Sequence, residues 1–343
     1  MNLTLGLALL ALALLVGLGL HAWWAARRAA PRREDASVDP APVRVEPSLG
    51  EGASGLDPVG TLALVTARRP SRLDPLIDAV VGMALETPVT GEMAVAHLPA
   101  SWRAGSKPVH IEGMNTETAE WELPRHGQRY GEFQAGVQLA NRSGALNEIE
   151  YSEFVQKAQA FCEGVGAMAD FPDMLEVIAR ARELDAFAGP LDAQLAVTLR
   201  ANGAAWSVGY VQQCAARQGF TNGVLPGRLV MPGAQDGAPP VLVLSFDPQA
   251  ALADDPQAAA VREVSLSLDV PQTSEDEEPF PAWHRAATAL STEMDAVPVD
   301  DQGAPVTLHA YAAIGKELGS LYRQLESRDL AAGSAAARRL FSG

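Results

Sequence analysis

The stretch "AQLAVTLRA", residues 193–201, carries the alternation that decides the fold. Leu195, Val197 and Leu199 fall on one face, and smaller or polar residues lie between them, as in a strand with one buried face. The segment "WSVGYVQQCAARQG" (206–219) follows with a helical pattern that ends at Gly219. A strand followed at once by an amphipathic helix predicts a sheet with helices packed on one face.

The same pattern continues to residue 327. Strands are expected near "GVLPGRLVM" (223–231), "PPVLVLSF" (239–246) and "VREVSLSLDVP" (261–271). Two helices, 280–295 and 308–327, then close this second unit, with "AVPVDDQGAPV" between them. In the last of the three strands, Val264, Leu266 and Leu268 are expected to point into the core.

An equivalent order of elements precedes it, between residues 73 and 189. The strand "PLIDAVVGMAL" (75–85) leads to a short helix with Thr90 as N-cap, then to two strands and "EFQAGVQLAN" (132–141). Helices 148–164 and 171–187 follow, and Gly189-Pro190 ends the unit. A repeated order of elements indicates a duplication. The predicted fold class is therefore α+β, with two tandem antiparallel-sheet and helix sandwiches of the split β-α-β, ferredoxin-like kind.

The N-terminus has the composition of a membrane anchor. No charged residue interrupts the apolar run between Leu3 and Trp24, which is long enough to cross a bilayer core of about 30 Å. Trp23 and Trp24 suit the membrane interface, and Arg27 and Arg28 suit its cytoplasmic side. Residues 1–26 are thus expected to be a transmembrane helix, with the N-terminus periplasmic and the rest cytoplasmic. The alternative is a cleaved signal peptide, with the Ala-rich stretch after Trp24 as its cleavage site.

The remaining boundaries follow from composition. Residues 27–72 are rich in proline, glycine and charge without an apolar period, which indicates a flexible linker. The two units then occupy 73–189 and 190–328, and residues 329–343 are expected to form a tail. A net charge of −16 argues against nucleic acid as a partner.

A search of the sequence for catalytic chemistry finds no candidate. Asp300-Asp301 lies in a turn-forming segment, no histidine or cysteine has the spacing of a metal site, and no phosphate-binding or nucleophile motif occurs. Cys162 and Cys214 are each expected to be reduced, buried thiols. The sequence thus predicts a protein that is not an enzyme and has no cofactor and no metal.

The anchor, the linker and the second unit together resemble the ZipA family of bacterial cell-division proteins. The pieces that carry this resemblance are "RQGFTNG" (217–223), "VSLSLDVPQ" (264–272) and "AVPVDDQGAPVT" (296–307), which leads into the final helix. The resemblance implies a six-stranded antiparallel sheet backed by three helices, whose open face binds the C-terminal peptide of the tubulin-like protein FtsZ. It also implies an inner-membrane adaptor that tethers the FtsZ ring during septum formation. The short linker and the unit at 73–189, which could contact other division proteins, depart from the family pattern.

The strand period of two gives the residues expected to contact the peptide. They are Ala196, Thr198, Leu225, Val243, Ser265 and Ser267. Most are polar or small, whereas the family's groove is apolar, and this puts the strength of binding in doubt. An alternative function is a membrane-anchored sensor that binds a small ligand between paired ferredoxin-like domains. Polar groups converging on a cleft between the units would favour the sensor, and exposed apolar residues on the sheet would favour the adaptor.

Overall fold

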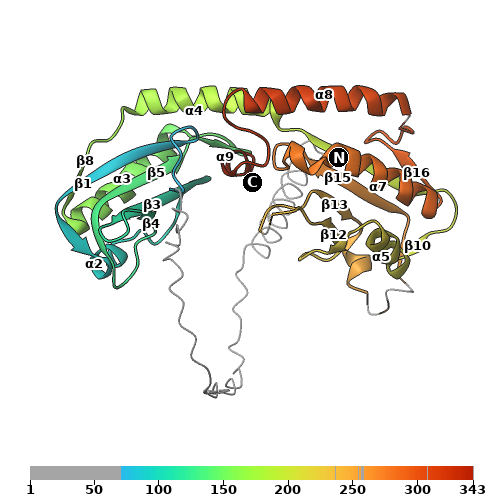
Figure 1. The fold of residues 1–343 in the computed structure, drawn as a ribbon, viewed down its shortest axis with the longest axis horizontal. Helices are drawn as coiled ribbons and strands as arrows, with labels where there is room; N and C mark the ends of the chain where they lie inside the picture. Colours follow the sequence, from blue (N-terminus) through green and yellow to red (C-terminus); the bar gives the residue numbers. More distant parts are fainter. Residues whose placement is uncertain (1–70, 236, 254, 256–258, 307, 343) are drawn as a thin grey trace, which may run out of the picture. The chain divides into compact units, whose positions relative to one another are not determined.

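The first half of the described chain is built on a six-stranded antiparallel sheet (Figure 1). The computed structural model describes residues 71–342 except 236, 254, 256–258 and 307. The strands are β1 (Asp78–Thr90), β2 (Arg103–Ala104), β3 (Lys107–Asn115), β4 (Trp121–Glu122), β5 (Arg129–Gln138) and β8 (Ala167–Ala169). Their order is β2-β3-β5-β1-β8, with β4 paired to β3. A small hairpin, β6 (Ala140–Asn141) and β7 (Gly144–Ala145), follows β5.

Three helices belong to this half, and local capping fixes where they begin. They are α2 (Gly91–Ala96), α3 (Glu148–Val165) and α4 (Met174–Ala188), and a 3-10 turn, η1 (Gly189–Leu191), follows. Thr90 caps α2 as expected, by accepting the Met93 N–H at 3.4 Å. Asn147 and Glu150 form a capping box at the start of α3. Helix α3 then packs on the sheet through an edge-to-face contact between Phe161 and Phe133, so one face of the sheet is covered.

The second half contains another six-stranded antiparallel sheet. Its strands are β9 (Gln194–Ala201), β11 (Thr221–Asn222), β12 (Arg228–Met231), β13 (Leu242–Ser245), β15 (Glu263–Asp269) and β16 (Ala296–Val299). Its helices are α5 (Val208–Arg217), the short α6 (Pro248–Ala251), α7 (Pro279–Glu293) and α8 (Leu308–Glu326). A separate strand pair, β10 (Trp206–Ser207) with β14 (Ala260–Val261), and the 3-10 turn η2 (Glu275–Glu277) complete it.

The core of the second half lies between this sheet and its helices. Val264, Leu266 and Leu268 are buried, so the predicted inward face of β15 is confirmed. The indole of Trp283 on α7 donates to the Leu266 carbonyl at 3.2 Å, which ties the helix to the sheet. Together with the first half, this arrangement confirms an α+β fold built on antiparallel sheets.

The two sheets share the order of their strands. The order β3-β5-β1-β8 in the first corresponds to β13-β15-β9-β16 in the second. In each half, the last strand of this series is short and lies in sequence between two long helices. Neither β8 nor β16 was expected as a strand, because each is only three or four residues long and has no extended alternation. The common order supports the duplication indicated by the sequence.

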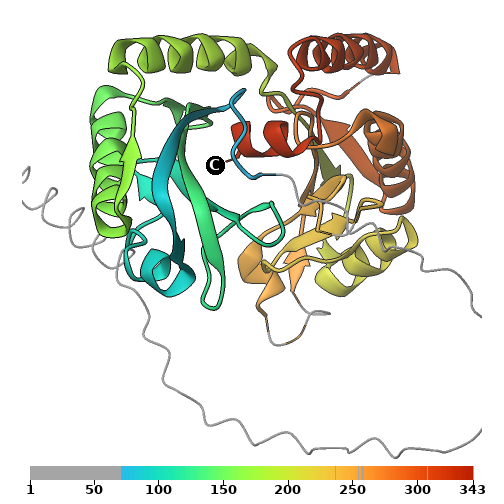
Figure 2. The same ribbon diagram turned by 60° about the vertical axis from the view of Figure 1, so that its left-hand side comes forward.

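The C-terminal segment packs on the first half. Residues 329–343, expected to be a tail, contain helix α9 (Ala335–Leu340). Leu330, Leu340 and Phe341 are at most 2 % exposed and belong to the hydrophobic core of the first half. The apolar residues of this segment are too few to show a period, so periodicity alone could not predict where they pack. Figure 2 shows α9 on the side of the first sheet opposite to helices α3 and α4.

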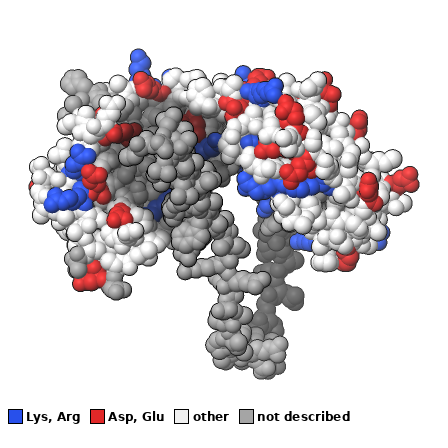
Figure 3. All heavy atoms as spheres, turned by 180° about the vertical axis from the view of Figure 1, so that it is seen from behind, with Lys and Arg blue, Asp and Glu red and all other residues white. Residues whose placement is uncertain are grey.

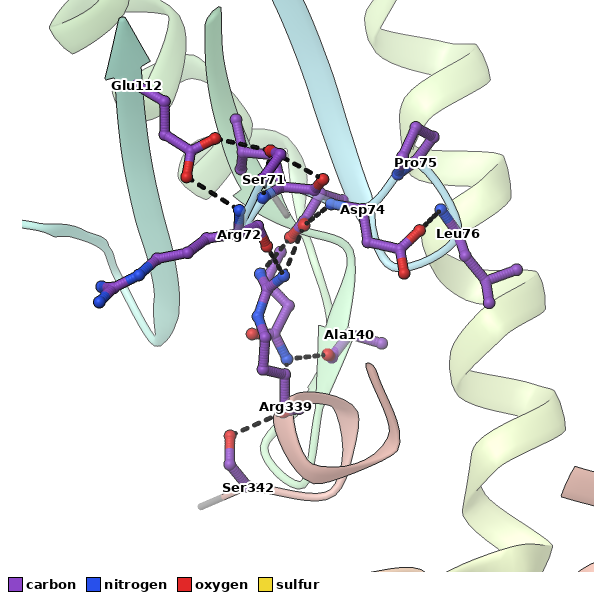
Figure 4. Close-up of polar contacts among 12 residues, drawn as sticks. Ser71, Arg72, Asp74, Pro75, Leu76, Glu112, Ala140, Arg339 and Ser342 are labelled. Atoms are coloured by element: carbon purple, nitrogen blue, oxygen red, sulfur yellow. Dashed lines mark hydrogen bonds and ion pairs between the residues drawn. The ribbon is translucent and has the colours of Figure 1, made fainter. Parts of the chain in front are cut away.

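One end of the other face of the first sheet is covered by two segments of the chain itself (Figure 4), while Gly82 and Ala84 on the same face of β1 are exposed. The Glu112 carboxylate accepts the Ser71 hydroxyl at 2.6 Å and the Arg72 N–H at 2.9 Å. The Arg339 guanidinium from α9 binds both carboxylate oxygens of the buried Asp78, at 2.6 and 2.8 Å. The start and the end of the described chain therefore both cover the part of this face that carries Glu112 and Asp78.

The anchor and most of the linker lie outside the described residues. This applies to residues 1–70, and therefore to Trp23, Trp24, Arg27 and Arg28. Among the helices that the structure describes, none combines the length and the apolar character required to span a bilayer.

Candidate functional site

The open face of the second sheet is formed by residues that alternate with the buried core positions. Ser267 on β15 lies between Val243 on β13 and Ala196 on β9, and one step along the strands Ser265 pairs with Thr198. Ala196 is exposed, and the other four are partly exposed. The strand period therefore places five of the six expected residues on one face, as predicted.

A hollow of about 310 Å³ lies on this face. Its lining includes Val243 and Ser267 from the predicted set, but not Ala196, Thr198, Leu225 or Ser265. The remaining lining residues are Arg142, Gln194, Arg228, Pro239, Pro240, Val241, Leu268, Asp269 and Gln272. The volume is at the lower end of the range of small-molecule sites, and it would accept a few side chains of a bound peptide.

One wall of the hollow comes from the first half. Arg142, in the turn of the β6–β7 hairpin, binds Asp192 through two nitrogens at 2.7 and 3.0 Å and also binds Asp269 at 2.9 Å. Burial disfavours its charge, but the hydrogen bonds to the two carboxylates outweigh this effect and raise the pKa of the guanidinium. Arg142 is therefore a neutralised cation, and its function in the hollow is structural.

A buried lysine fixes the turn that presents Arg142. The Lys107 ammonium group is fully buried and donates to Asn141 Oδ1 and to the Gly144 carbonyl, both at 2.6 Å. These two acceptors flank Arg142 in the chain, so the turn is held from both sides. Burial lowers the pKa of Lys107, although the charges of Glu150 and Asp185 oppose this shift.

Arg228, at the start of β12, is the other cation of the hollow. Its side chain is exposed, and its guanidinium makes no ion pair or hydrogen bond with any residue that the structure describes. By register it lies opposite Ser245, which in turn pairs with Ser265. Arg228 is thus available to a ligand, in contrast to Arg142.

Leu225 lies in the loop between β11 and β12. Gly227 adopts a φ of +73°, and a Cβ there would lie 2.5 Å from the Phe246 carbonyl oxygen, so only glycine fits this tight turn. The turn leaves Leu225 58 % exposed, next to the fully exposed Val224. Leu225 is an exposed apolar residue, but it lies on a loop beside the sheet and does not line the hollow.

The cysteines and the possible metal ligands of the described residues form no further site. Cys162 and Cys214 are free and buried, as expected, and burial raises the pKa of both thiols. Within the described residues, no three His, Cys, Asp or Glu side chains are grouped as metal ligands would be. On the face in Figure 3, basic and acidic side chains lie next to one another, so the part of this face that the structure describes has no continuous basic surface for a phosphate backbone.

Some of the lining residues that were not predicted nevertheless follow a pattern in the sequence. Gln194 and Asp269 continue the outward alternation of their strands, and Arg228 follows the predicted Leu225 closely. Arg142 has no such signal, because it lies 127 residues before Asp269 in a hairpin turn of the other half. Comparisons with known proteins add nothing here: no family model matches this sequence, and no curated protein matches it.

Proposed function

We propose that this protein is a non-catalytic adaptor that binds the C-terminal peptide of FtsZ on the open face of the second sheet. The observation that carries the proposal is this face itself. The described helices cover one side of the sheet, and the other side has a hollow beside Val243 and Ser267 and exposed apolar residues on the adjacent loop. An extended peptide needs a shallow site with a few side-chain pockets of this kind.

The rest of the proposal rests on the ZipA resemblance and on the N-terminal sequence. In this assignment both halves are ferredoxin-like units, the second is the FtsZ-binding domain, and residues 1–26 anchor the protein in the inner membrane. The first half is a candidate contact for other division proteins. A partly polar site binds a single tail weakly, but many tails on one FtsZ filament can hold the filament by avidity.

A binding experiment tests the proposal directly. A fluorescent FtsZ tail peptide is titrated with the full-length protein in detergent, and its anisotropy is followed. Ser267→Glu and Val243→Asp place a negative charge in the hollow and should weaken binding about tenfold or more, because an unpaired charge must then be desolvated beneath the peptide. Leu225→Ala should have a smaller effect, since Leu225 does not line the hollow.

The controls separate binding from folding. Ser101→Glu adds the same charge at an exposed position of the first half and should bind like the wild type. Leu266→Ala, in the core, should instead cost about 2–5 kcal/mol of unfolding free energy. If the wild type does not bind the tail, or if both hollow variants bind it unchanged, the proposal is wrong.

The polar lining of the hollow favours a second candidate, the small-ligand sensor. Arg142 from the first half converges with Gln194, Arg228 and Gln272 from the second, as expected for a site between paired domains. A thermal-shift measurement with succinate and glutamate distinguishes the two functions. A rise in melting temperature that Arg228→Gln abolishes, without binding of the FtsZ tail, would establish the sensor in place of the adaptor.

A further inference from the structure

We propose that Arg228 binds a carboxylate group of the peptide that occupies the hollow. This inference rests on the proposed function and specifies the chemistry of its ligand. It makes Arg228 the residue that determines specificity on a sheet face where the other charged side chains are paired, Arg200 with Glu263 and Asp269 with Arg142.

The difference between the two arginines of the hollow supports this assignment. Arg142 binds two carboxylates, Asp192 and Asp269, at 2.7–3.0 Å, and so has no free charge. Arg228 lines the same hollow and has no partner among the described residues. A guanidinium without a partner, beside uncharged Ser267 and Val243, attracts an anion and can bind a carboxylate through two parallel hydrogen bonds.

The surrounding charges select the kind of anion. Asp269 also lines the hollow and, with Asp192, gives two negative charges around Arg142. A dianionic phosphate group would be repelled by these carboxylates and would find Arg228 as the one cation without a partner among the described lining residues. A single carboxylate matches the single free charge of Arg228. The ligand is therefore expected to be an acidic residue or the terminal carboxylate of an extended peptide.

A double-mutant cycle tests this pairing. Two forms of the FtsZ tail peptide are used, the natural one and one in which every Asp and Glu is amidated and the C-terminus is blocked. The wild-type protein should bind the natural peptide about tenfold more tightly than the amidated one, because a hydrogen-bonded charge pair is worth this factor. Arg228→Gln should bind both peptides equally, and Arg228→Lys should recover part of the preference.

The control is Arg129→Gln, which removes an exposed arginine of the first half whose side chain has no partner in the described chain. It should keep the wild-type preference, so a general effect of net charge is separated from a local one. If Arg228→Gln still prefers the natural peptide as the wild type does, this inference is wrong while the proposed function stands. If the wild type binds neither peptide, the proposed function fails, and this inference fails with it.

Discussion

The same order of strands gives a partly covered sheet face in the first half and an open one in the second. By register, the pair Asp78–Gln138 in the first sheet corresponds to Gln194–Asp269 in the second. Each of these pairs contains a carboxylate that binds an arginine from a distant part of the chain, Arg339 in one case and Arg142 in the other. The difference lies in what surrounds them.

In the first half, the two terminal segments of the described chain cover the part of the face around Asp78 and Glu112. Leu73 is 6 % exposed and lies against Gly136. The residue of the second sheet that is equivalent to Gly136 by register is Ser267, which lines the hollow. The second sheet has no such covering segment among the described residues. One unit of a duplicated fold is thus covered at this position by its own chain, and in the other the described residues leave the matching position open.

The largest expected effect concerns the two arginines that hold these faces. Arg339→Met would leave Asp78, whose side chain is fully buried, with the Asp74 N–H as its remaining partner. This should cost about 3–5 kcal/mol, as for other broken buried pairs. Arg142→Met should cost about 1 kcal/mol or less, because Asp192 and Asp269 are about 30 % exposed and water can replace the arginine. Urea unfolding, with hydrogen exchange to locate the loss, measures both effects.

A third variant tests the reason for this difference. Asp78→Asn combined with Arg339→Met removes the buried charge as well as its partner, and it should recover part of the lost stability. Equal losses of unfolding free energy in the two single variants would contradict the view that the carboxylate is shielded from water in the first face and not in the second.

A smaller effect is expected at the matched positions Gly136 and Ser267. In Gly136→Ala the new Cβ would lie 2.4 Å from Leu73 Cδ2, so Leu73 must move away from the sheet. This overpacking should cost about 1–3 kcal/mol, whereas Ser267→Ala, in an open hollow, should change stability by about 0.5 kcal/mol or less. If Gly136→Ala were as stable as the wild type, Leu73 would not be a fixed part of the first face.

The sequence was sufficient for what depends on local periodicity. The inward face of β15, the Thr90 cap and the shared order of elements all follow from spacing and capping chemistry. It was insufficient where a distant segment changes the environment of a residue. Gln138 alternates at the end of β5 with the core residues Val137 and Leu139, yet it is 1 % exposed, and its amide donates to the Arg339 carbonyl 201 residues away.

The candidate site divides in the same way. Val243 and Ser267 follow from the strand period, and both line the hollow. Arg142 could not be predicted as a lining residue, since its position there depends on its ion pairs with Asp192 and Asp269, which are distant in sequence. Leu225 was one of the residues expected to contact the peptide, but a turn fixed by Gly227 places it on a loop outside the lining.

The smallest expected effect is a dependence of stability on pH that belongs to the first half alone. Burial, and next the charge of Arg339, lower the pKa of His110, which lies among Asp78, Arg72 and Glu112. The unfolded chain therefore binds this proton more readily than the folded one. Above the ordinary histidine pKa of about 6.5 the free energy of unfolding is unaffected, and it falls as the pH drops below that value.

The second sheet provides the matched substitution, because Val243 is paired with Ser267 just as His110 is paired with Gly136. His110→Val should therefore reduce the stability lost between about pH 7.5 and pH 5, while the carboxylates of both proteins titrate alike. Urea unfolding at both pH values, with hydrogen exchange of the β3 and β5 peptides, measures the difference. Because the second half has no buried histidine on its open face among the described residues, exchange of β13 and β15 should respond to pH equally in both proteins. An identical loss of stability in wild type and variant would show that His110 is solvated, and that the first face is more open than its contacts indicate.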